Sequence, residues 1–133
     1  MAVPILRAAL PAPLPPPPVL GTVPAFRLVD QTGAPFGPEQ LSGRVWVADF
    51  VFTRGPDVCP RMTERLAAVH RTLGDRADVV SVSVDPAYDT PERLAAFARA
   101  HGAESPRWPF LTGQSEHVPE AVLRAFKVAF ARD

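Results

Sequence analysis

Residues 45–60 read VWVADFVFTRGPDVCP, and this stretch decides the fold. Its first eight residues form an apolar run that is typical of a buried strand, and Pro60 suits the first position of a helix. The chain's one cysteine, Cys59, therefore lies where a strand passes into a helix. Free N–H groups and the positive end of the helix dipole stabilise a thiolate there, so the stretch indicates redox or soft-metal chemistry.

Strand and helix patterns continue on both sides of this stretch. Residues 26–36 alternate around a turn at 30–33, which predicts a small hairpin. Apolar residues at helical spacing predict a helix from Pro60 to Gly74. Further along we expect a valine-rich strand over 79–84, a helix that Thr90 caps and Gly102 ends, a short strand over 108–111, a third helix over about 115–126 and the start of a strand over 128–131.

This order of elements predicts an α/β fold with a mainly parallel sheet and right-handed crossovers. In such sheets the functional loops lie at the carboxyl ends of the strands. The Cys59 loop and the loop over residues 85–89 both follow strands, so topology alone predicts that they are neighbours in space.

Composition limits the class of protein. The chain has 133 residues, enough for one domain, and 14 basic residues balance 14 acidic ones, which indicates no nucleic-acid partner. One cysteine excludes a disulfide scaffold and a cysteine-rich zinc site. Eight of the 17 prolines lie in residues 1–24, so we expect a proline-rich tail or linker over residues 1–22 and a folded domain over residues 23–133.

The chain shows no membrane segment and no secretory signal. No stretch approaches the roughly 20 apolar residues of a membrane-spanning helix. Pro4 and Arg7 interrupt the apolar residues at the N-terminus, and no basic residue precedes them. These features predict a soluble, unexported chain.

Three separated motifs resemble those of the Sco/SenC family. Residues 52–60, FTRGPDVCP, resemble its metal-binding loop, and residues 83–91, SVDPAYDTP, resemble its second signature. Residues 26–33 and 111–113 resemble its first hairpin and a later loop. The resemblance extends over about residues 22–130.

The resemblance implies a thioredoxin-like fold with an N-terminal β-hairpin. Proteins of this family are usually tethered to a membrane and face the periplasm or the mitochondrial intermembrane space. They bind copper and help to assemble the copper centre of cytochrome c oxidase, and some reduce disulfides on the same pathway. Their site has two cysteines separated by three residues and a histidine nearer the C-terminus.

This chain departs from the family's pattern at two ligands. Gly55 stands where the family has its first cysteine, and the histidine would lie beyond Asp133. We therefore expect a weak or incomplete copper site with Cys59 as its one ligand. We also expect that the C-terminal strands and helix of the fold are missing, which would leave a sheet edge unpaired.

Other polar residues around Cys59 have two interpretations each. Asp57, Asp85 and Asp89 are expected to surround the site as turn and cap residues. The alternative for Asp57 is that it tunes the thiol or contacts a partner, and the alternative for Asp85 and Asp89 is acid–base work by paired carboxylates. Arg54 either raises the thiolate fraction of Cys59 or is a solvated surface residue. The three histidines, at positions 70, 101 and 117, do not match the family's ligand position.

The leading hypothesis is a copper-handling accessory protein for respiratory oxidase assembly, located in the periplasm or at a membrane by resemblance. Its partner would be a cytochrome c oxidase subunit or another copper-pathway protein. The second hypothesis is a single-cysteine redox protein that uses an external thiol, which is the one enzymatic activity the chain can support. The third is a non-catalytic interaction module that has lost the metal. The first two require that Cys59 is accessible.

Overall fold

A computed structural model describes residues 10–23, 25–56 and 58–114. The elements are β1 (Leu28–Val29), β2 (Pro35–Phe36), the 3-10 turn η1 (Pro38–Leu41), β3 (Trp46–Val51), α1 (Val58–Leu73), the 3-10 turn η2 (Gly74–Arg76), β4 (Asp78–Ser83), α2 (Pro91–Ala100) and β5 (Phe110–Leu111). The third helix and the last strand expected from the sequence lie outside the described residues, and so do Asp57 and His117.

The central sheet is parallel, as the order of elements predicts. Its described strands pair in the order β3-β4-β5, with Trp46 opposite Asp78 and Ser81 opposite Phe110. The predicted hairpin is also present, because β1 and β2 pair antiparallel with Leu28 opposite Phe36. One further bridge joins Val29 to Thr112, so the hairpin is attached to the end of the sheet.

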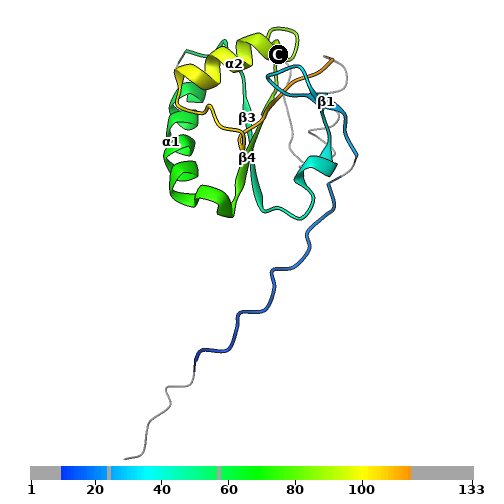
Figure 1. The fold of residues 1–133 in the computed structure, drawn as a ribbon, viewed down its shortest axis with the longest axis vertical. Coiled ribbons are helices and arrows are strands. Elements are labelled where there is room, and N and C mark those ends of the chain that lie inside the picture. The colour runs from blue at the N-terminus through cyan, green and yellow to red at the C-terminus, as the bar shows by residue number, and fades with distance from the viewer. Residues whose placement is uncertain (1–9, 24, 57, 115–133) are drawn as a thin grey trace, which may run out of the picture.

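The hairpin and the helices cover opposite faces of the sheet (Figure 1). Along β4, Val79 packs against the helix side, whereas Val80 and Val82 pack against the hairpin side. All six residues of β4 are buried. Both faces of β4 are covered, which favours small β-branched valines, and the two serines between them are buried because their hydroxyls are hydrogen-bonded.

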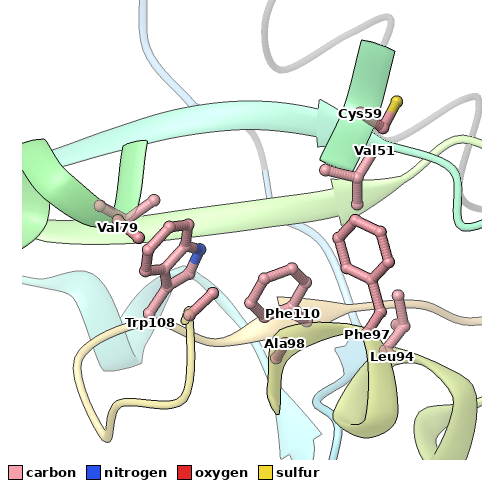
Figure 2. Packing of buried hydrophobic residues seen from close by; sticks show 10 residues of the cluster. Val51, Cys59, Val79, Leu94, Phe97, Ala98, Trp108 and Phe110 are labelled. Atoms are coloured by element: carbon pink, nitrogen blue, oxygen red, sulfur yellow. The ribbon is translucent and has the colours of Figure 1, made fainter. Parts of the chain in front are cut away.

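The core between sheet and helices is aromatic. Phe97 of α2 meets Phe110 of β5 edge to face with ring centroids 6.3 Å apart, and Phe110 stacks on Trp108 at 5.7 Å. Figure 2 shows these rings in a row beneath β3 and β4, with Val51 and Cys59 at one end of the row. Burying large rings supplies much of the stability of a small domain.

The two helices begin for different reasons. Thr90 caps α2, because its Oγ1 accepts a hydrogen bond from the N–H of Arg93 at 3.3 Å, as the sequence predicts. The prediction that α1 begins at Pro60 is wrong by two residues, since this helix starts at Val58. Proline is tolerated there because the first turn of a helix has no intrahelical use for its N–H groups.

The proline-rich segment extends away from the folded part (Figure 1). Its described residues, 10–22, form neither helix nor strand, and the side chain of Leu14 is 92% exposed. The boundary between tail and domain stays a prediction. Within the described part of the chain, every helix is too short or too polar to cross a bilayer.

A polar chain of contacts crosses the helix-covered face of the sheet. Trp108 is fully buried, and its Nε1–H donates to the Oγ of Ser81 at 2.8 Å. The Ser81 hydroxyl in turn donates to Oδ1 of Asp49, whose Oδ2 is buried without a partner among the described residues. Burial raises the pKa of the Asp49 carboxyl, and the hydrogen bond from Ser81 offsets part of that rise.

Asp49→Asn is expected to make the fold more stable at neutral pH and less sensitive to pH. A carboxyl with a raised pKa in the folded chain stabilises the fold below its ordinary pKa, and that contribution is lost as the pH rises through the raised value. The variant removes the buried charge and should gain roughly 1–3 kcal/mol at pH 7. Urea unfolding at pH 5 and pH 8 measures this, and an unchanged pH dependence would contradict it.

Trp108→Phe should destabilise the fold by about 2 kcal/mol, because it removes the hydrogen bond to Ser81 and leaves a cavity beside Phe110. Urea unfolding followed by circular dichroism gives the free energy of unfolding. Val45→Ala is the matched control, since Val45 is 70% exposed and should change stability by less than about 0.5 kcal/mol. Equal effects of the two changes would refute the account of the core.

Candidate functional site

Cys59 lies in the first turn of α1, on the inner face of the helix. Thr63 and Ala67 follow at four-residue steps and are buried with it. Cys59 is 4% exposed and packs in one cluster with Val51, Leu94 and Phe97. In Figure 2 its sulfur points away from Val51 and from the Phe97 ring.

The expectation of an accessible thiol is therefore wrong for this conformation. Cys59 lies within the first turn of α1, on the face of the helix that packs against the core. A metal ion or a partner thiol can reach the sulfur only if the surrounding side chains move.

Gly55 lies in the loop before α1, and the ring of Phe52 occupies the space that a side chain at this position would take. A Cβ atom built at Gly55 would lie 2.3 Å from Cε2 of Phe52, which is inside van der Waals contact. Phe52 is 40% exposed, so its ring can turn outward at small cost. The space of a second ligand is thus filled by a movable aromatic side chain.

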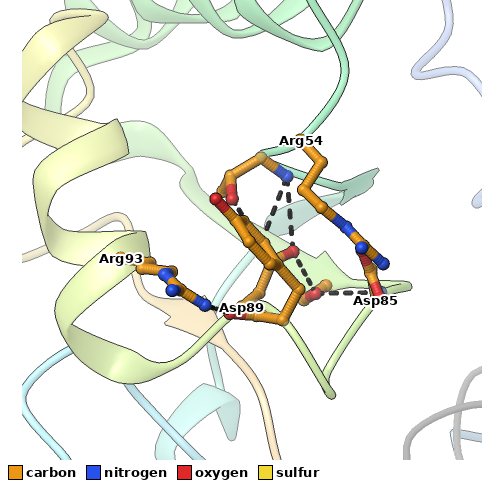
Figure 3. A network of polar contacts seen from close by, with 7 residues as sticks. Arg54, Asp85, Asp89 and Arg93 are labelled. Atoms are coloured by element: carbon orange, nitrogen blue, oxygen red, sulfur yellow. Dashed lines mark hydrogen bonds and ion pairs between the residues drawn. The ribbon is translucent and has the colours of Figure 1, made fainter.

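A buried carboxylate joins the loop before Cys59 to the loop after β4. Asp89 is fully buried and accepts hydrogen bonds from the Oγ1 and the N–H of Thr53, the latter at 3.3 Å. It also accepts from the Oγ of Ser83 at 2.6 Å. Figure 3 shows this network at the carboxyl ends of the strands. The prediction that the two loops are neighbours is confirmed.

Asp85 makes a second connection between the same loops. The Nε of Arg54 donates to its Oδ2 at 2.7 Å, and this bond raises the pKa of the Arg54 guanidinium. The guanidinium of Arg54 also lies 4.7 Å from the ring centre of Tyr88, and that of Arg93 lies 4.0 Å from it. Arg54 is thus engaged by Asp85 and Tyr88, and Asp85 and Asp89 serve loop structure.

The described histidines lie elsewhere. His70, in the last turn of α1, contacts the Oγ of Ser105 at 3.1 Å through Nε2. His101, at the end of α2, contacts Glu64 at 3.1 Å through Nδ1. Both lie near helix C-termini, whereas Cys59 lies at a helix start. The role expected for Asp57 stays a prediction, and His117 lies outside the described residues.

The described donors do not fit a site of two cysteines and a histidine. Across residues 10–23, 25–56 and 58–114, no three His, Cys, Asp or Glu side chains gather closely enough to hold a metal ion. The soft donors there are the thiol of Cys59 and the thioether of Met62, three residues further along α1. Sequence reasoning overlooked both Met62 and the Phe52 ring, although the spacing Cys-x-x-Met was visible.

Comparisons with known proteins extend over most of the chain. The SCO1/SenC family profile matches residues 18–133. The SCO1 protein homolog of Bacillus subtilis is 38% identical over 106 residues, which cover 77% of this chain and 55% of that protein. The chain therefore spans about half the length of the curated relative that it matches.

Solved structures of Sco proteins also superpose on most of this chain. An SCO1/SenC family lipoprotein from Bacillus anthracis has a TM-score of 0.74 at 36% identity, covering 80% of this chain and 66% of that one. BsSco, described as a cytochrome c oxidase assembly protein with a disulfide switch, has a TM-score of 0.75 at 33% identity, covering 84% and 67%. Yeast Sco1 with copper bound has a TM-score of 0.72 at 27% identity, covering 83% and 61%.

These matches confirm the fold that the resemblance implies. The described β-hairpin, parallel strands and two helices are those of the thioredoxin-like Sco structures, although this chain is shorter than they are. Profile, sequence relatives and solved structures agree, and the chain belongs to the SCO1/SenC family.

Proposed function

We propose that this chain handles copper during the assembly of cytochrome c oxidase, with Cys59 as the thiolate that holds the ion. The observation that carries the proposal is the position of Cys59, at the start of α1 after a loop that Asp85 and Asp89 fix. Cuprous ion prefers soft thiolate ligands, which this position supplies. The relatives that bind copper or assemble the oxidase support the same function.

The site works through an exchangeable ion. One protein thiolate gives few chelate contacts, so copper bound at Cys59 passes readily to a partner that offers more donors. The partner is an oxidase subunit or another protein of the copper pathway. Binding begins with a movement that exposes Cys59, and it releases the thiol proton to solvent.

We propose that the chain is membrane-associated and faces the periplasm. A lipoprotein of the same family is among the solved structures, which supports the membrane association. That location places Cys59 on the side of the membrane where thiols are oxidised, and bound copper would shield the thiolate from oxidation.

A disulfide-exchange function is the second candidate, and the disulfide switch described for BsSco favours it. The Cys59 thiolate would attack a partner disulfide, form a mixed disulfide and release the other partner sulfur as a thiolate. The chain has one cysteine, so an external thiol must then attack the mixed disulfide and release Cys59.

Cys59→Ser should abolish thiol-dependent copper binding. We expect the unmodified chain to retain about one Cu(I) ion per chain or per pair of chains in competition with a chromophoric chelator, and we expect at least tenfold weaker binding by the variant, about 1.4 kcal/mol. Equal binding by both proteins would refute the copper proposal. If the chain retains no copper but Cys59 is alkylated rapidly at neutral pH, disulfide exchange is favoured. If the chain neither retains copper nor reacts rapidly with the alkylating agent, a non-catalytic interaction module is favoured.

Gly55→Cys should strengthen Cu(I) binding at least tenfold, because it adds a second thiolate four positions before Cys59. The Phe52 ring must turn outward to admit the new side chain, so Phe52 should become more exposed. Gly55→Ser is the matched control, since it has the same steric demand and no soft donor. Equal affinities of these two variants would show that the loop does not bring positions 55 and 59 together.

A further inference from the structure

We propose that the side-chain amide of Gln31 takes the place of a neighbouring strand along β5, and that it closes this edge of the sheet against pairing with a second copy of the chain. The edge of β5 is thus an interaction surface that the fold keeps covered. The role of Gln31 involves neither Cys59 nor copper, so it is independent of the proposed function.

The hairpin begins to pair with the chain after β5 and then turns away. Val29 and Thr112 exchange two backbone hydrogen bonds of 2.9 Å, as an antiparallel pair does. Two residues further along, the same register places position 31 opposite Phe110. The main chain leaves the sheet at Asp30, whose Oδ1 accepts from two backbone N–H groups of the turn at 2.8 and 3.2 Å. Position 31 therefore continues the register without its backbone.

The side chain of Gln31 supplies what its main chain does not. Its Oε1 accepts from the N–H of Phe110 at 3.0 Å, and its Nε2 donates to the carbonyl of Trp108 at 3.4 Å. Both of these residues are fully buried, so leaving their backbone groups unpaired would cost free energy. One amide, itself half-buried, thus covers a donor and an acceptor.

The two covered groups point away from the rest of the sheet. On the inner side, the carbonyls of Arg107 and Pro109 accept hydrogen bonds of 3.0 Å from β4. Backbone groups of successive strand residues face alternate sides, so those of Trp108 and Phe110 face outward. Without Gln31, the outer edge would present one donor and one acceptor at the spacing that another strand requires.

A second copy of the chain fits this edge because the edge is complementary to itself. When two such strands pair antiparallel about a two-fold axis, the N–H of Phe110 in one copy faces the carbonyl of Trp108 in the other, and the reverse bond forms at the same time. A cavity of about 340 Å³ beside the edge, lined by Gln31, Arg107 and Pro109 among others, has room for side chains of the incoming strand. An open edge of this kind is a template for association, although β5 is short and the dimer is therefore weak.

Stability alone is the other explanation for the two hydrogen bonds of Gln31. They attach the hairpin to the sheet whether or not another strand can reach the edge. The explanations differ in the state of association. Loss of stability alone leaves the folded chains as they were, whereas an open edge joins them in pairs.

Gln31→Met tests the proposal, because it keeps the length of the side chain and removes the amide. In the full chain without copper, we expect the N–H of Phe110 to exchange with solvent deuterium about tenfold faster, since it loses its hydrogen bond. Sedimentation velocity should show a reversible dimer whose fraction rises with protein concentration and exceeds that of the unmodified chain. A folded variant with unchanged exchange at Phe110, or with unchanged association, would overturn the proposal.

Two further variants keep the proposal testable if Gln31→Met does not fold. Gln31→Glu retains the acceptor for Phe110 and places a charge at the edge, so exchange should stay slow and the variant should form no additional dimer. Gln40→Met is the matched control, because the amide of Gln40 bonds only to Gly37 and Pro35 nearby. Its exchange at Phe110 should stay within about twofold of the unmodified chain. Fast exchange at Phe110 in either variant, or a dimer of Gln31→Glu, would count against the assigned role of Gln31.

Discussion

The arrangement of the site depends on the buried carboxylate of Asp89. It lies beneath the junction of two loops and accepts hydrogen bonds from Thr53 in one and from Ser83 at the end of β4. Burying a carboxylate without hydrogen-bond donors costs free energy, so the position of Asp89 depends on the donors of Thr53 and Ser83. Because Thr53 begins the loop that leads to Cys59, the network fixes the direction in which the chain enters α1. The ion pair of Arg54 with Asp85 lies at the surface and adds less, since solvent screens it.

Sequence patterns were sufficient for the framework and insufficient for the thiol. The valine run, the Thr90 cap and the alternation of strands and helices each follow from local rules, and each was found as predicted. α1 begins at Val58, two residues before Pro60, and Cys59 packs in one cluster with Val51 and Phe97, contacts that the sequence does not reveal. No local rule settles such a shift, because proline is acceptable at any position of the first turn.

Side-chain contacts that no sequence pattern predicts account for the other omissions. Asp89 was expected to shape a turn, but its bond to Thr53 joins residues 36 positions apart and requires the folded sheet. The packing of the Phe52 ring over Gly55 could not be predicted from the sequence either, since neither residue type indicates that the ring turns toward the glycine. Membership of the family could be predicted from short motifs because their residues are consecutive. The donor set could be predicted only in part, because a ligand is defined by what lies near it in space.

The chain contains a single tyrosine, Tyr88, and the fold places it between the two guanidinium groups at this junction. The environment of its phenol ring therefore changes if Arg54 or Arg93 moves away from it. The two guanidinium groups lie over this ring, and a lone tyrosine gives one unambiguous set of ring resonances. The protein thus carries its own spectroscopic probe at the point where its two loops meet, and that probe can follow separation of the loops without any attached label.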